Sequence, residues 1–146
     1  MRLTSFSDYS LRVLIYLGTA PGRLATIDQV AQAYGISANH LMKVVHHLGR
    51  LGCVETVRGK GGGMRLARAP GEINVGQIVR ASEDSLALVE CFEGGAGECR
   101  IERSCVLKHA LTEALQAFLK VLDGYTLADL IAPARPLARI MFAAKS

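Results

Sequence analysis

The chain has 146 residues, half of them hydrophobic, with 17 Lys and Arg against 13 Asp and Glu and no Trp. This length and hydrophobic fraction predict one compact domain with at most an appended element, and they exclude a disordered chain. Charges interrupt every apolar stretch before the roughly 18 residues that a membrane span needs, and the first residues lack the apolar core of a secretory signal. We therefore expect a cytoplasmic protein with no membrane partner.

The net charge of +4 is unevenly distributed along the chain. Residues 1–68 hold nine Lys or Arg against three acids, a net charge of +6, whereas residues 69–146 hold eight against ten, a net charge of −2. A basic half is typical of a nucleic-acid-binding surface, although a segment of this length is also basic by chance in many proteins. The charge therefore indicates DNA as a partner only together with suitable motifs.

Three helices are predicted in the first fifty residues. Apolar residues recur at helical spacing over roughly 5–18. A second helix is expected to begin after Thr26, the first member of a capping box, and to end at Gly35. A third has Ser37 as its N-cap and ends near Gly49. Two short helices separated by a few residues that include a glycine have the form of a helix-turn-helix motif.

Residues 53–57 and 64–68 alternate like two strands around the glycine-rich turn 58–63. Helix, turn, helix and hairpin together predict a mainly α-helical winged helix-turn-helix fold with a small β-hairpin wing, in which His47 also faces outward from the third helix. The residues expected to contact DNA, from the first helix, the third helix and the wing, are Arg12, Ser37, Asn39, His40, Lys43, Arg58, Lys60, Gly61 and Gly62.

The glycine-rich turn has two other readings. It is either a merely flexible hairpin or the phosphate-binding loop of a nucleotide enzyme. The second is excluded because the spacing G-x-x-x-x-G-K-[ST] and the helix that follows it are both missing. Neither a catalytic triad nor an acid–base pair stands out, so we do not expect an enzyme.

A long helix over about 104–122 is predicted after a short helix at 74–80 and a loop-like segment at 83–102. Its apolar residues recur at alternating steps of four and three, as in a coiled coil. They are Leu107, Leu111, Ala114, Phe118, Val121 and Tyr125. Such a stripe often packs within its own chain, but little sequence remains to cover it here. A second subunit is the economical partner, and we therefore expect a homodimer.

These patterns divide the chain into four regions. They are a winged helix-turn-helix DNA-binding domain at 1–80, a cluster-binding loop at 81–105, a dimerisation helix with a short capping helix at 106–131, and a C-terminal tail at 132–146, which is either frayed or docked.

Three of the four cysteines, Cys91, Cys99 and Cys105, form a C-x7-C-x5-C pattern ahead of the long helix. The fourth, Cys53, is expected to be a buried residue of the first wing strand. Three thiols on one loop can surround one centre, and thiolates select zinc, copper(I) or an iron–sulfur cluster.

A zinc site would favour shorter gaps and a fourth ligand, for which His109 is available. Gaps of seven and five residues instead suit a larger iron–sulfur cluster. Three unligated thiols are the remaining alternative.

Residues 1–131 resemble the iron–sulfur winged-helix transcription regulators of the NsrR and IscR family, and in particular its nitric-oxide-sensing branch. The resemblance is carried by the glycine wing 57–63, the segment Tyr125 to Leu130, and the sequences around Cys91 and Cys105. It implies a homodimer crossed through its long helices, with one cluster per subunit.

In that branch an aspartate near the start of the first helix completes a [4Fe-4S] cluster of the other subunit, a position that is Asp8 here. The resemblance thus implies Cys91, Cys99, Cys105 and the partner subunit's Asp8 as ligands. Members of the IscR type carry a [2Fe-2S] cluster with a His three residues after the last Cys. This chain has Lys108 there, with His109 beside it. The seven-residue first gap is also longer than is usual in the family.

The function implied is a repressor that binds palindromic operator DNA while its cluster is intact and leaves it when nitric oxide nitrosylates the cluster. The alternatives are an IscR-like regulator of cluster biogenesis and a zinc- or thiol-based redox regulator.

Overall fold

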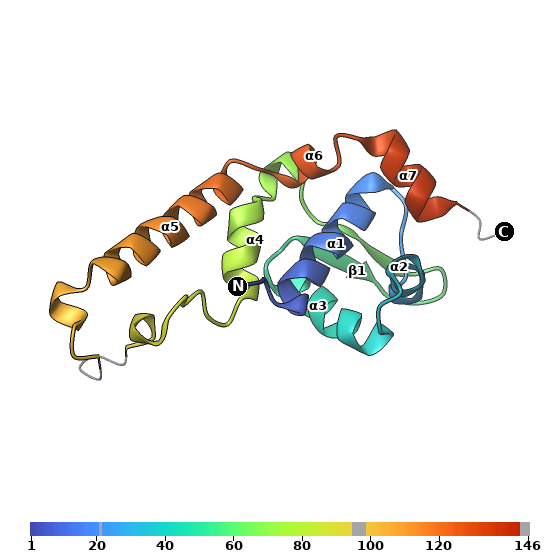
Figure 1. Ribbon diagram of the computed structural model, residues 1–146. Coiled ribbons are helices and arrows are strands. Elements are labelled where there is room, and N and C mark those ends of the chain that lie inside the picture. The colour runs from blue at the N-terminus through green and yellow to red at the C-terminus, as the bar shows by residue number, and fades with distance from the viewer. Residues whose placement is uncertain (21, 95–98, 144–146) are drawn as a thin grey trace.

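The computed structural model describes residues 1–20, 22–94 and 99–143 (Figure 1). A winged-helix body forms one end of the molecule, and a long helix projects from it toward the other end. The helices are α1 (Ser5–Thr19), α2 (Ile27–Tyr34), α3 (Ala38–Arg50), α4 (Val75–Ser82), α5 (Val106–Asp123), α6 (Leu127–Leu130) and α7 (Ala134–Phe142), and the strands are β1 (Val54–Val57) and β2 (Gly63–Leu66).

The predicted helix-turn-helix is confirmed, and each helix begins where a side chain caps it. Thr26 and Gln29 form the capping box of α2, and Gly35 ends that helix in the left-handed conformation that glycine adopts without strain. The Ser37 side chain accepts a hydrogen bond from the backbone N–H of His40 at the start of α3. These caps fix the angle at which α3 leaves the turn.

The wing is an antiparallel hairpin in which Val54 pairs with Leu66 and Val57 with Gly63. Ala25, just before α2, forms a further bridge to Met64 of β2, with a backbone bond of 2.8 Å from the Met64 N–H to the Ala25 carbonyl. The base of the wing is therefore tied to the helix-turn-helix.

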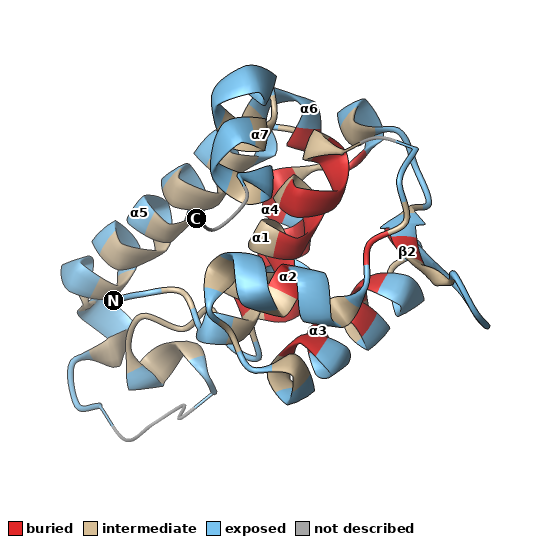
Figure 2. Cartoon of the chain, turned by 90° about the vertical axis from the view of Figure 1, so that its right-hand side faces the viewer, coloured by how far each residue is buried: buried red, intermediate tan, exposed pale blue. Residues whose placement is uncertain are grey.

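The hydrophobic core lies between α1, α3, α4 and the base of the wing (Figure 2). Leu14, Leu41, Leu48 and Ile73 are at most 1% exposed within it. Burying such a side chain contributes about 1.5–3 kcal/mol. Cys53 is also 1% exposed, which confirms the expected core position, and its sulfur accepts a 3.4 Å hydrogen bond from the Arg68 guanidinium.

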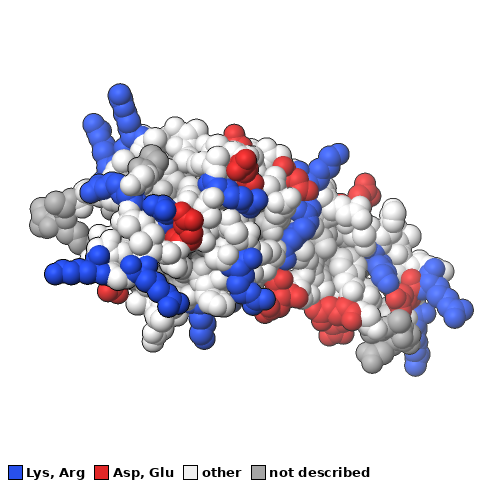
Figure 3. Space-filling model, turned by 180° about the vertical axis from the view of Figure 1, so that it is seen from behind, with Lys and Arg blue, Asp and Glu red and all other residues white. Residues whose placement is uncertain are grey.

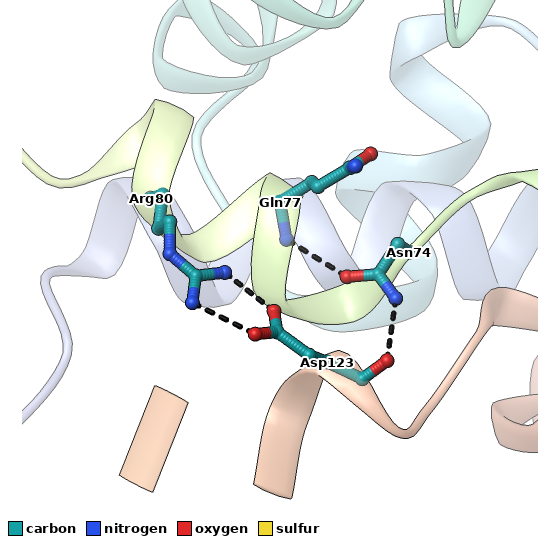
Figure 4. Close-up of polar contacts among 4 residues, drawn as sticks. All are labelled: Asn74, Gln77, Arg80 and Asp123. Carbon is teal, nitrogen blue, oxygen red and sulfur yellow. Dashed lines mark hydrogen bonds and ion pairs between the residues drawn. The ribbon is translucent and has the colours of Figure 1, made fainter. Parts of the chain in front are cut away.

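The junction of α4 and α5 is held by polar contacts rather than by a deep core (Figure 4). Asn74 caps α4 by accepting a hydrogen bond from the Gln77 N–H, and its amide donates to the carbonyl of Asp123 at 2.8 Å. The Arg80 guanidinium forms two hydrogen bonds to the Asp123 carboxylate, one of 2.8 Å. The end of α5 is thereby fixed to the winged helix.

The C-terminal tail contains a helix, α7, that the sequence pattern did not predict. Pro136 is its third residue, where the backbone N–H has no intrahelical partner to lose. Phe142 packs edge-on against Tyr16 of α1 at 5.2 Å between ring centroids, and Met141 contacts the core. Of the two possibilities left open for the tail, its described part is docked.

Within the described ranges, no helix combines the length and the apolar composition that crossing a membrane requires.

Candidate functional site

The three predicted ligand cysteines line one pocket of about 430 Å³ at the far end of α5. Cys91 lies in a short 3-10 turn, Cys99 in the loop and Cys105 at the start of α5, and all three are free thiols. The remaining lining is largely apolar and consists of Val89, Glu90, Ile101, Leu107, Lys108 and Leu111. Three thiols around one apolar pocket are a donor set that fits an iron–sulfur cluster. The segment 95–98 of this loop lies outside the described residues.

Cys105 is the N-cap of α5, so the helix begins at Val106, two residues later than expected. Its sulfur accepts a hydrogen bond from the Lys108 N–H at 3.3 Å. The Cys105 sulfur therefore lies at the positive end of the helix dipole.

Lys108 places a fixed positive charge at the same pocket. Its ammonium lies 2.6 Å from the Glu102 carboxylate. The hydrogen bond and the negative charge of Glu102 raise the pKa of Lys108. The position at which IscR-type relatives carry a His thus holds a lysine that stays protonated and cannot ligate a metal in that state.

Among the described residues, no three Cys, His, Asp or Glu side chains are close enough together to hold a single metal ion. His109 is exposed, and it is not among the described residues that line the cysteine pocket. His109 therefore lies outside the cysteine pocket within this protomer.

Asp8 lies in the first turn of α1 and is not among the described residues that line the cysteine pocket of its own protomer. Its carboxylate pairs with Arg12 one turn later, at 2.9 Å, and both side chains are nearly half exposed. Such a pair contributes only about 0.3–0.5 kcal/mol. The Asp8 carboxylate is therefore free to exchange Arg12 for another partner at small cost.

The cysteine-bearing segment is joined to the start of α1 by Glu83. Its carboxylate accepts hydrogen bonds from the backbone N–H of Thr4, at 2.8 Å, and from the Thr4 hydroxyl. Although burial alone would raise the pKa of Glu83, hydrogen bonds from Ser7 and Thr4 lower it, so the carboxylate stays ionised. Glu83 thus connects the segment after α4 to the first turn of α1.

The predicted DNA-contacting residues of α3 fall on its N-terminal half. Asn39 and Lys43 are exposed, whereas His40 is half-buried against Tyr9. Asn39, His40 and Lys43 line a hollow with Phe6 of α1. A helix that presents amide, imidazole and ammonium groups from one end is suited to base edges and phosphates in a major groove.

The expectation that His47 faces outward is wrong. Its ring lies edge-on against Phe6, with 5.2 Å between centroids, and its Nε2 is 3.3 Å from the Ser82 hydroxyl. Burial, together with the charge of Arg50, lowers the pKa of His47. His46 is the exposed histidine of this turn instead.

The wing presents Arg58, Lys60 and Gly61 to solvent, with Gly62 partly covered. Figure 3 shows Lys and Arg side chains projecting around the winged-helix end of the molecule. This agrees with the net charge of +6 counted over residues 1–68.

One exposed apolar residue was not singled out from the sequence. Met42 is 55% exposed in the groove between α3 and the wing, an unusual place for a large apolar side chain. It lies outside the buried stripe of α3, which consists of Leu41, Val44, Val45 and Leu48.

One face of α5 is left exposed by the residues that the structure describes. Leu111 and Phe118 of the predicted stripe are half-buried in their own protomer, so the uncovered stripe differs from the prediction. It recurs at steps of three and four and consists of Leu107, Ala110, Ala114, Ala117 and Val121. Leu107 is 63% and Val121 62% exposed. An apolar heptad face of this kind requires a partner helix.

Comparison with known proteins agrees with this arrangement. The curated HTH-type transcriptional regulator NsrR of Bacillus subtilis (strain 168) is 55% identical over 132 residues, covering 90% of each chain. The solved structure of T. potens IscR is 27% identical with a TM-score of 0.73, covering 92% of this chain and 88% of that one. CymR (YrzC), the global cysteine regulator of B. subtilis, is 25% identical with a TM-score of 0.73, covering 91% and 98%.

The Rrf2 family profile, described as an iron-dependent transcriptional regulator, matches residues 3–133. This match spans the winged helix, the cysteine-bearing segment and α5, and it ends just before α7. The chain therefore belongs to the Rrf2 family of iron-dependent transcriptional regulators.

Proposed function

We propose that the protein is a nitric-oxide-sensing repressor that binds palindromic operator DNA as a homodimer while an iron–sulfur cluster occupies its cysteine pocket. The observation that carries the proposal is the gathering of Cys91, Cys99 and Cys105 around one pocket, three thiols where a four-iron cluster has four sites. The similarity to proteins named NsrR supports the choice of signal.

The ligand set we propose is Cys91, Cys99 and Cys105 from one subunit and Asp8 from the other. When bound, the cluster supplies the iron with which nitric oxide reacts. The protein contributes the two features that make the site responsive. One is the start of α5, where the Lys108 N–H donates to the Cys105 sulfur, and the other is a fourth ligand whose alternative partner, Arg12, is one helical turn away.

Asp8 ties the start of α1 to the other subunit when it is a ligand, and α1 packs directly on α3. The tether would fix the spacing of the two recognition helices at about one turn of DNA, which a palindromic operator requires. Release of Asp8 removes that constraint. A loss of about 4 kcal/mol of coupling lowers DNA affinity roughly a thousandfold.

Asn39, His40 and Lys43 on α3, with Arg58, Lys60, Gly61 and Gly62 on the wing, form the proposed DNA surface. Ser37 contributes as the cap of α3, and Arg12 lies beside this surface on α1. We propose DNA-binding roles for these residues and a catalytic role for none of them.

A [2Fe-2S] cluster with His109 as fourth ligand is the second candidate, favoured by the likeness to T. potens IscR. The two candidates differ in which substitution removes the cluster. Asp8→Asn is expected to destabilise a [4Fe-4S] cluster and His109→Gln to leave it intact, and the reverse holds for the alternative.

Anaerobic purification followed by absorbance spectroscopy and native mass spectrometry tests the proposal directly. We expect a coloured dimer with the mass of four irons and four sulfides per subunit. Nitric oxide should release it from a duplex that the wild-type protein selects from a randomised library.

Cys91→Ala, Cys99→Ala and Cys105→Ala should each abolish the colour, whereas Cys53→Ala, in the core of the wing, serves as the matched control and should keep it. A colourless wild-type protein that binds the duplex fully and ignores nitric oxide would overturn the proposal.

A further inference from the structure

Two aromatic rings of α1 lie edge-on against two histidines of the recognition helix. Tyr9 meets His40 at 4.9 Å between ring centroids, with an interplanar angle of 75°. Phe6 meets His47 in the same way nearer the other end of α3. Only the first of these contacts reaches the DNA-reading end of the helix, because His40 lies in the first turn of α3 beside Asn39.

Arg12 joins Tyr9 to Asp8 on the surface of α1. Its guanidinium is paired with the Asp8 carboxylate at 2.9 Å and stands 6.0 Å from the centroid of the Tyr9 ring. On its other side it stands 5.7 Å from the Tyr34 ring, whose hydroxyl donates to the Arg12 carbonyl at 2.9 Å. Arg12 is therefore held in place by aromatic rings, with the carboxylate as its anionic partner.

These contacts form a continuous line from Asp8 through Arg12 and Tyr9 to His40. A cation over an aromatic face is attracted to the ring, and an edge-on ring pair has a preferred geometry. If the carboxylate leaves Arg12, the guanidinium loses its anionic partner while the Tyr9 ring remains beside it, so its position relative to that ring is expected to change. The orientation of the His40 imidazole depends on that ring.

We propose that Tyr9 is a positioning residue that transmits the bonding state of Asp8 to His40 at the reading end of α3. The inference rests on the proposed function in that Asp8 alternates between Arg12 and the partner subunit's cluster. In this proposal Asp8 pairs with Arg12 when it does not ligate the cluster, and ligation of the cluster by Asp8 releases Arg12. The ring of Tyr9, rather than its hydroxyl, carries the effect.

The proposed coupling between Asp8 and His40 can be tested by NMR in the cluster-free protein without DNA. The chain has four histidines, at positions 40, 46, 47 and 109. Asp8→Ala removes the partner of Arg12 and should shift the ring resonances of His40 in an NMR spectrum, while His109, on α5, stays unchanged. In a Tyr9→Leu background the same Asp8→Ala change should leave His40 unmoved. An equal shift in both backgrounds would overturn the proposal.

A double-mutant cycle on DNA affinity tests the consequence, using the cluster-loaded protein and the duplex selected by wild type. Tyr9→Leu should weaken binding about two- to tenfold, the range expected for an aromatic pair, and Tyr9→Phe should restore it. In a His40→Ala background Tyr9→Leu should have no further effect. Additive losses would show that Tyr9 acts only through general stability and would overturn the proposal.

Thermal unfolding is measured for each variant to check that it folds. Tyr9→Met replaces Tyr9→Leu if the latter does not fold. The NMR experiment uses neither cluster, nitric oxide nor DNA, so its outcome is independent of the proposed function. A wild-type protein whose DNA affinity is the same with and without the cluster would refute the sensing mechanism. A missing His40 response would refute the role of Tyr9 alone.

Discussion

Gly62 of the wing is required by the space around it rather than by its backbone angle. A Cβ atom there would collide with the carbonyl oxygen of Val57 and would lie 2.8 Å from that of Gly59. Both are backbone atoms, so the hairpin itself must shift. We expect Gly62→Ala to destabilise the fold by about 1–3 kcal/mol and to weaken DNA binding, as measured by urea unfolding and fluorescence anisotropy.

Gly71→Ala is the matched control, because a Cβ there would meet no atom within 4 Å. Its effect on the free energy of unfolding should remain within about 0.5 kcal/mol. Equal urea midpoints for the two variants would show that the wing accommodates a side chain at position 62.

The three cysteines of the C-x7-C-x5-C pattern line one pocket, as their shared loop indicated, and their role as cluster ligands stays a prediction. The position of His47 was not predictable, since helical periodicity leaves open which of two adjacent histidines meets a neighbouring element. That choice depends on Phe6, which lies about forty residues earlier in the chain.

The contribution of the junction between α4 and α5 to the free energy of unfolding should decrease at acid pH. The hydrogen bonds from Arg80 lower the pKa of Asp123 below its ordinary value. A group whose pKa is lower in the folded state stabilises the fold above its unfolded pKa, about 3.9, and the stabilisation is lost as pH falls through the folded value. The difference in unfolding free energy between wild type and Asp123→Asn should therefore shrink as the pH is lowered from 7 through this range.

Urea titrations at a series of pH values measure this difference, and the Arg80→Gln background provides its control. Without the guanidinium, Asp123→Asn should produce no pH-dependent change. A difference of constant size down to the acid limit would mean that the ion pair does not couple folding to protonation.

Most elements were predictable because their signals are local, as with the Thr26 capping box and Gly35. The helix α7 was not, because its two prolines resemble a tail and its stabilising contacts lie on α1. The prediction of which apolar residues of α5 are exposed was only partly correct, for a similar reason. Periodicity identified an apolar helix, but which apolar residues the chain itself covers depends on how the helix packs.

For the whole molecule, we expect the uncovered face of α5 to decide whether two subunits assemble. Val121 is 62% exposed at the C-terminal end of the apolar stripe, so Val121→Glu should leave the protomer folded while placing a charge in the expected subunit interface. We expect a monomer by sedimentation velocity with unchanged helix content by circular dichroism, and weak binding to a palindromic duplex because only one half-site is engaged. Gln116→Glu, half a turn away from the stripe on the same helix, adds the same charge and should remain dimeric. A dimeric Val121→Glu protein at the same concentration would place the interface on another surface.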